Sequence, residues 1–289
     1  MEFNAKVIAD SIAQSGPRII TMELCYPRLI HSELMTHRVF SRNAASSRAI
    51  PVKKMIEQVR DNPAMPIHFG ANQPGMQADQ ELSSVGIASA KYLWMKAAKN
   101  AADVAEQMNT LGVHKQVANR ILEPFQWMKT IVTATAWKNF FELRDHRDAE
   151  PNIRFLAQLM KAAIEKSNPQ YLDYCQWHIP YLTQSVDSRR NQVFFAGGIA
   201  SGKILTIEEA IKCSVARCAR VSYLTHDNAS PSLEKDIELH DRLVGSTPIH
   251  ASPAEHQATP LRDAHYENLQ GNFRGWQQYR KYLETGISL

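Results

Sequence analysis

Residues 30–48 read I-H-S-E-L-M-T-H-R-V-F-S-R-N-A-A-S-S-R, and the remainder of the chain is organised around this stretch. It combines two histidines, three arginines and several hydroxyls with one asparagine and few bulky apolar residues. Guanidinium groups stay charged and can bond bidentately to phosphate or another planar anion. The stretch therefore indicates an anion-binding site, and a solvated, basic helix end is the alternative for this composition.

The composition of the 289 residues is that of a soluble globular protein, with 44% hydrophobic and 21% charged residues. A net charge of +4 falls short of a nucleic-acid-binding surface, so we expect small anionic partners and no nucleic acid. No apolar run is long enough to cross a bilayer, and the N-terminus does not resemble a signal peptide. Four cysteines without a C-x-x-C pair suit a reducing compartment. We expect a cytoplasmic protein that has no membrane partner.

Local patterns predict the elements of the first half of the chain. Residues 20–26 alternate apolar and polar side chains, which is typical of a half-buried strand. Residues 29–39 and 52–60 have helical spacing, and residues 41–47 lack periodicity and are expected to form a loop. An Ala-rich helix is expected over residues 84–111. Its predicted core stripe is Leu93, Ala97, Ala101, Val104, Met108 and Leu111.

Further elements follow the same rules. We expect a helix over residues 115–122, and a strand over 128–141 that either continues or becomes a helix at Thr135. Helices are expected over 150–166 and from Ser230 to Val244. The sequence T-I-E-E predicts a capping box at Thr206.

No repeat or linker divides the chain, so we expect one domain over residues 1–289. Residues 61–82 and 170–203 are rich in proline, glycine or aromatics and are expected to be loops inserted into it. The sequence G-G-I-A-S-G-K lacks the spacing of a nucleoside-triphosphate loop. The group His250, Glu255 and His256 lacks the H-E-x-x-H spacing of a zinc hydrolase, so we expect no metal.

The run H-R-V-F-S-R-N-A-A-S-S-R (residues 37–48) resembles the signature of the flavin-dependent thymidylate synthases, R-H-R-x-x-S-x-N-x-x-S-x-R. Only the leading arginine differs, because Thr36 occupies its position. Residues 112–124, 139–144 and 149–157 are similar to later blocks of the family and place Arg120 and Arg144 at arginine positions.

The opening blocks of that family resemble residues 219–223 (A-R-V-S-Y) and 250–256 (H-A-S-P-A-E-H), which here come after the signature. The resemblance therefore implies a circularly permuted, divergent member. The implied fold class is α+β, with a central mixed or antiparallel sheet and flanking helices. Termini that lie close together in a fold make such a permutation physically easy.

The resemblance implies an enzyme of the thymidylate synthase type. In that family, NADPH reduces bound FAD, methylenetetrahydrofolate delivers one carbon to C5 of dUMP, and the reduced flavin supplies the hydride. The implied catalytic residues are Arg144, His250 and Ser46. The implied flavin-binding residues are His37, Arg38, Asn139, Ser222, Ser252 and Glu255. The implied nucleotide-binding residues are Glu33, Ser46, Arg48, Arg120 and Arg144. The resemblance also implies a homotetramer with sites built between subunits.

Departures from the family pattern leave two alternatives open. Glu33 stands where a glutamine usually contacts the nucleotide, and Asp148 replaces a histidine that contacts the flavin. A carboxylate accepts hydrogen bonds from an exocyclic amine such as N4 of cytosine. One alternative is therefore a flavin- and folate-dependent hydroxymethylase or methylase of another pyrimidine nucleotide, such as dCMP. The other is a non-catalytic nucleotide-binding module.

Overall fold

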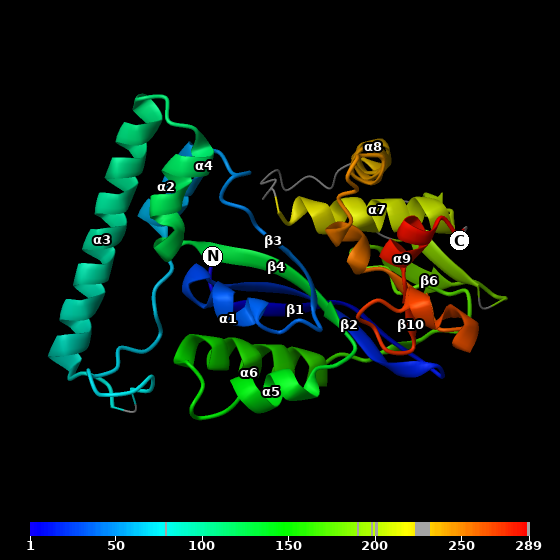
Figure 1. Ribbon diagram of the computed structural model, residues 1–289, viewed down its shortest axis with the longest axis horizontal. Helices are drawn as coiled ribbons and strands as arrows, with labels where there is room; N and C mark the ends of the chain where they lie inside the picture. The colour runs from blue at the N-terminus through cyan, green and yellow to red at the C-terminus, as the bar shows by residue number, and fades with distance from the viewer. Residues whose placement is uncertain (79, 190, 198, 200–201, 223–231, 288–289) are drawn as a thin grey trace.

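The structure is a computed structural model that describes residues 1–78, 80–189, 191–197, 199, 202–222 and 232–287. A five-stranded sheet runs through its centre, and helices lie on both faces and at one end (Figure 1). Tyr223 and Ser230, named above in a motif and as a helix start, lie outside the described residues. Among the helices of the described part, none is long and apolar enough to cross a membrane.

The central sheet has the strand order β3-β4-β2-β1-β5. All its pairs are antiparallel except β1 with β5, so the expected mixed sheet is confirmed. The strands are β1 (Asn4–Ala13), β2 (Gly16–Pro27), β3 (Ser41–Ala44), β4 (Trp127–Ala134) and β5 (Gln170–Tyr171).

Helices α5 (Lys138–Arg144) and α6 (Pro151–Glu165) cover one face of the sheet, and α7 (Ile207–Arg220) lies on the other (Figure 1). The alternating apolar side chains of β2, among them Met22 and Leu24, pack against Ile153 and Leu156 of α6, as their spacing predicted. The opposite face of β2 is buried as well, because Thr21 is inaccessible to solvent. The expectation of a half-buried strand is therefore wrong for this residue.

Three helices form one end of the molecule: α2 (Val52–Asp61), α3 (Ser84–Thr110) and α4 (Lys115–Ala118). The structure confirms the α3 helix, but of its predicted core stripe only Ala101 and Met108 pack against the core. The buried face consists of Ala98, Ala102 and Ala105, whose small side chains let α3 approach α2 closely. Leu93 and Leu111 are exposed instead. A sequence pattern alone does not reveal which face of a long helix its neighbours cover.

The signature stretch folds differently from its local pattern. After the short helices η1 (Arg28–Ile30) and α1 (His31–Met35), the chain forms strand β3 where a loop was expected. β3 pairs with β4, so its backbone hydrogen bonds come from a partner almost ninety residues later in the chain. Its inward residues, Ser41 and Asn43, are buried although polar, and this gives no apolar alternation from which to predict a strand.

The other elements agree with the predictions only in part. The 3-10 helix η2 (Asn119–Phe125) continues α4 past Pro124, and β4 gives way to α5 after Thr135. The Thr206 capping box at α7 is confirmed. The expected loop over residues 170–203 contains the hairpin β6 (Thr183–Val186) and β7 (Gln192–Phe195), which continues into β8 (Ile204–Leu205).

The C-terminal part packs around α7 and one end of the sheet (Figure 1). It comprises α8 (Leu233–Val244), η4 (Ser252–Glu255), β9 (Ala258–Pro260), η5 (Ala264–Leu269), β10 (Trp276–Gln278) and α9 (Tyr279–Thr285). Gly275 lies against Gly16 at the start of β2, where an added Cβ would meet Ser15 and Gly16 backbone atoms at 2.4 and 2.5 Å. The segment after residues 250–256 therefore lies beside the start of β2, the strand that precedes the signature. In a circularly permuted chain these two segments must be close, because they would be joined directly in the unpermuted order.

Candidate functional site

A cavity of about 450 Å³ joins the signature stretch to the blocks that follow it by more than 170 residues. We call it the signature cavity. Four of the predicted site residues line it, namely Arg48, Ser222, His250 and Ser252. Asn43 also contributes, and apolar walls come from residues such as Leu243, Ile249 and Pro253.

Two hydrogen bonds hold the signature against α7 and the residues that follow it. The Asn43 side-chain amide donates to the Cys218 carbonyl oxygen at 3.2 Å, and the Ser46 backbone N–H donates to the Ser222 carbonyl oxygen at 3.0 Å. These bonds position Arg48, whose exposed guanidinium has no hydrogen-bond or ion-pair partner among the described residues. An unpaired arginine at a cavity is available to bind an anionic ligand.

His250 and Ser252 reach the cavity from the short segment before and within η4. The backbone N–H of His250 donates to the Leu243 carbonyl oxygen at 3.1 Å, which ties the segment to α8. Both side chains are exposed. Glu255, three residues later, points to Arg280 of α9 and forms an ion pair with it.

Arg144, at the end of α5, lies in a second group of residues that also includes Glu33 of α1 and the two residues after α1, Thr36 and His37; we call it the Arg144 cluster. Its guanidinium donates to the Glu33 carboxylate at 3.0 Å, to His37 Nε2 at 3.0 Å and to the Thr36 hydroxyl at 3.2 Å. Thr36 thus occupies the position of the missing family arginine and supports Arg144 from there. All three guanidinium nitrogens are engaged.

Burial and charge set the protonation of the Arg144 cluster. Burial lowers the pKa of His37, and the nearby Arg144 and Arg42 lower it further. Because Arg144 is always a donor, His37 Nε2 must be the acceptor and its proton resides on Nδ1. Burial raises the pKa of Glu33 and outweighs the opposing effect of Arg144, while Glu150 raises it further. A carboxylate with a raised pKa can serve as a hydrogen-bond partner whose protonation responds to a ligand.

The predicted nucleotide-binding residues belong to different sets of contacts in the structure. No hydrogen bond or ion pair among the described residues links the Arg144 cluster to the signature cavity. Arg120 is exposed and pairs with Glu123 at 2.8 Å, and Glu123 also accepts from the Ser47 hydroxyl at 2.7 Å. Arg38 and Asn139 are exposed and have no side-chain bond among the described residues.

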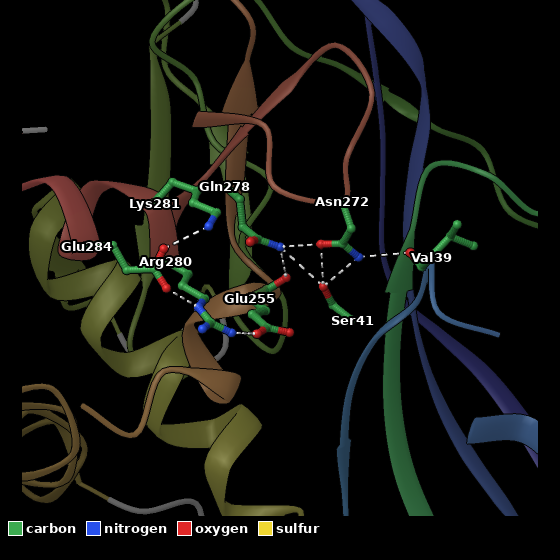
Figure 2. A network of polar contacts seen from close by, with 8 residues as sticks. All are labelled: Val39, Ser41, Glu255, Asn272, Gln278, Arg280, Lys281 and Glu284. Carbon is green, nitrogen blue, oxygen red and sulfur yellow. Dashed lines mark hydrogen bonds and ion pairs between the residues drawn. The ribbon is translucent and has the colours of Figure 1, made fainter. Parts of the chain in front are cut away.

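The C-terminal segment supplies contacts that no local sequence signal predicted (Figure 2). Asn272 donates to the Val39 carbonyl oxygen at 2.8 Å and exchanges hydrogen bonds with the Ser41 hydroxyl. The Gln278 amide donates to Ser41 at 3.2 Å and to the Glu255 carbonyl oxygen at 3.2 Å. These residues therefore join the signature to η4, a role that emerges only when distant segments meet.

Comparison with known proteins gives one family match. Residues 18–170 match the model of the family "Thymidylate synthase complementing protein". No curated protein matches the chain. The matching solved structures include a UMP/dUMP methylase PolB from Streptomyces cacaoi bound with 5-Br dUMP, which is 15% identical over 57% of this chain and 90% of that chain, with a TM-score of 0.48. The structure of the same enzyme bound with 5-Br UMP is 16% identical over 57% of this chain and 89% of that chain, with a TM-score of 0.48.

The matched residues contain the signature, Arg120 and Arg144, whereas residues 219–256 lie beyond them. Members of the family are generally flavin-dependent. Because the match spans more than half of the 289 residues, the chain belongs to the thymidylate synthase complementing protein family.

Proposed function

We propose that this protein is a flavin-dependent enzyme that transfers a one-carbon unit from methylenetetrahydrofolate to C5 of dUMP. The signature cavity is the observation that carries the proposal. It gathers Arg48, Ser222 and His250 from three separate blocks of the chain. Their convergence on one cavity is what a permuted family member requires.

The residues at the signature cavity fit a flavin nucleotide. Its hydroxyl groups, Ser222 and Ser252, suit the polar edge of the ring system, and Leu243 and Ile249 provide apolar walls. Arg48 lies at the same cavity and offers a positive charge for the phosphate of a nucleotide substrate beside the flavin. When bound, FAD would supply the hydride chemistry, with NADPH as its reductant.

The arginines have a clear chemical role in such a reaction. C5 of a uracil ring attacks a one-carbon electrophile only after negative charge has built up on the ring and its C4 oxygen, and positioned guanidinium groups stabilise that charge. In our proposal Arg48, Ser46 and Arg120 hold the nucleotide phosphate and sugar. Arg144 then faces the pyrimidine, with Glu33 and His37 fixing its orientation.

A second pyrimidine substrate is favoured by one observation. One Glu33 oxygen is bonded to Arg144, and no hydrogen bond to the other oxygen is present in the described part of the chain. The free oxygen is suited to accept a hydrogen bond from N4 of cytosine. The second candidate is therefore a methylase or hydroxymethylase of dCMP.

The separation of Arg144 from Arg48 supports a site shared between copies of the chain. One copy would contribute the signature cavity and a neighbouring copy the Arg144 cluster, as expected for a homotetramer. The α3 helix presents exposed apolar side chains for such contacts, including Tyr92, Leu93 and Val104.

The decisive experiment supplies NADPH and methylenetetrahydrofolate with either dUMP or dCMP and separates the products by mass. Formation of dTMP from dUMP supports the first proposal, and turnover of dCMP alone supports the second. Absorbance in the flavin bands is recorded first. A colourless protein that does not bind added FAD would exclude both reactions and leave a nucleotide-binding module.

A further inference from the structure

A second cavity of about 580 Å³ lies between segment 61–82 and the start of α6. Its walls include His68 and Ala78 from the segment, Arg147 from the loop between α5 and α6, and Arg154 from the second turn of α6. Segment 61–82 forms the loop below α3 in Figure 1. We call this space the Arg154 cavity.

Arg154 is the unusual residue of this cavity. Its Nε is buried and has no hydrogen-bond partner. No carboxylate or carbonyl oxygen in the described part of the chain accepts a hydrogen bond from its guanidinium. Arg154 as a whole is only partly buried, but a buried donor nitrogen that lacks an acceptor is unfavourable. The missing acceptor therefore points to a ligand.

The acidic groups around the Arg154 cavity are already occupied. Glu150 caps α6 by accepting from the Ile153 backbone N–H at 3.0 Å, and its other oxygen binds Asn152. Asp148 lies 3.3 Å from Arg147. Glu81 contacts His68 Nδ1 at 3.0 Å. None of these described carboxylates forms an ion pair with Arg154.

The loop that closes the cavity is held in place. Its backbone pairs across residues 69–82, and His68 Nε2 contacts the Ala78 carbonyl oxygen at 2.9 Å. The Ile67 backbone N–H donates to the Asn152 side chain at 3.0 Å, and Gln77 reaches the Asp148 carbonyl oxygen at 3.4 Å. These contacts fix the loop to the start of α6. The cavity is therefore a formed feature of the fold.

We propose that the Arg154 cavity binds the phosphate or carboxylate group of an anionic small molecule through Arg154 and Arg147. Both arginines can bond bidentately to such a group, and the N-terminal end of α6 adds a favourable dipole. That the occupant is a co-substrate of nucleotide methylation rests on the proposed function. The binding of an anion does not.

The test uses two probes, inorganic pyrophosphate and glutarate, titrated calorimetrically into the full chain at constant ionic strength. We expect at least one probe to bind the wild type about tenfold or more tightly than the Arg154→Gln variant, as for loss of a charged hydrogen-bond donor. The matched control is Lys166→Gln, which removes a charge at the exposed C-terminal end of the same helix. This variant should bind like the wild type.

Two further variants sharpen the result. Arg48→Gln should retain the binding that Arg154→Gln loses, which distinguishes this cavity from the signature cavity. Ala78→Asp places a carboxylate in the wall and should also abolish binding, so the test does not depend on one variant folding. Preference for pyrophosphate indicates a phosphate-bearing ligand, and preference for glutarate a carboxylate-bearing one.

Equal binding by the wild type and Arg154→Gln, or no binding of either probe, would overturn the proposal. Failure of the nucleotide reaction alongside Arg154-dependent binding would contradict the proposed function alone.

Discussion

Lowering the pH from 7 to 5 should destabilise the fold through two buried histidines, His178 and His256. His178 contacts the Ser11 hydroxyl at 2.9 Å and the Thr21 hydroxyl at 2.8 Å. The Thr133 hydroxyl lies 2.7 Å from the Thr21 hydroxyl and 2.8 Å from Nδ1 of His256. The two histidines thus belong to one polar chain inside the molecule.

Burial lowers the pKa of both histidines from 6.5 to about 3. Asp10 acts on His178 in the opposite direction, and His178 lowers the pKa of His256 further. Below pH 6.5 the unfolded chain therefore binds more protons than the folded one. The stabilisation present at neutral pH is lost as the pH falls from 6.5 towards 3.

The magnitude follows from this difference in proton binding. When the pH falls from 7 to 5, a histidine protonates in the unfolded chain but stays neutral in the folded one. For each such histidine, the free energy of unfolding falls by about 2 kcal/mol. The two together remove about 4 kcal/mol, a large part of a typical domain's stability. Carboxylates also contribute to the total, so a comparison with variants is needed to isolate the histidines.

Urea unfolding of the wild type and His178→Gln, followed by circular dichroism at both pH values, measures the effect. The free energy of unfolding of the wild type minus that of the variant should be about 2 kcal/mol smaller at pH 5 than at pH 7, because the variant no longer has this titrating group. Thr133→Val keeps both histidines, so its difference from the wild type should not change with pH. A His178→Gln difference that is equal at pH 7 and 5 would refute the reasoning.

Three other predictions concern the site. Arg48→Gln should weaken nucleotide binding by about tenfold or more, from the loss of a charge-assisted bond, and leave flavin binding intact; calorimetry with dUMP and flavin absorbance measure the two separately. If sites are shared between copies, co-refolding inactive Arg48→Gln with inactive Arg144→Gln should restore activity at about one site in four, whereas no recovery would indicate sites within one chain. Asn272→Ala removes bonds to Val39 and Ser41 and should lower the free energy of unfolding by about 1–3 kcal/mol, with faster amide exchange in β3. Unchanged exchange there would contradict that role for the C-terminal segment.

Elements that are set by residues close together in the sequence were predicted correctly, whereas elements that depend on distant parts of the chain were not. The start of α7 is encoded within four residues, because Thr206 and Glu209 satisfy each other's backbone N–H groups. The strand β3 is not local, since its hydrogen bonds come from β4 and its buried residues are polar. The packed face of α3 was misassigned for a related reason, because contact with α2 selected alanines over the larger apolar residues.

The candidate site, too, was predicted from the sequence only in part. The signature and its resemblance indicated an anion-binding, flavin-dependent family, and the family match confirms the membership. The sequence did not indicate which of the predicted site residues contact one another or line the same cavity. Arg144 binds Glu33 and His37, whereas Arg48 lines the signature cavity together with Ser222 and His250.

The sequence by itself indicated most of the helices and the family, because caps, periodicity and signature residues act over a few positions. Only the tertiary structure decided which residues share a cavity. It brought the late blocks beside the signature, joined Asn272 and Gln278 to Ser41, and left Nε of Arg154 without an acceptor among the described residues. These are consequences of long-range packing, where one side chain's partner depends on the path of the whole chain.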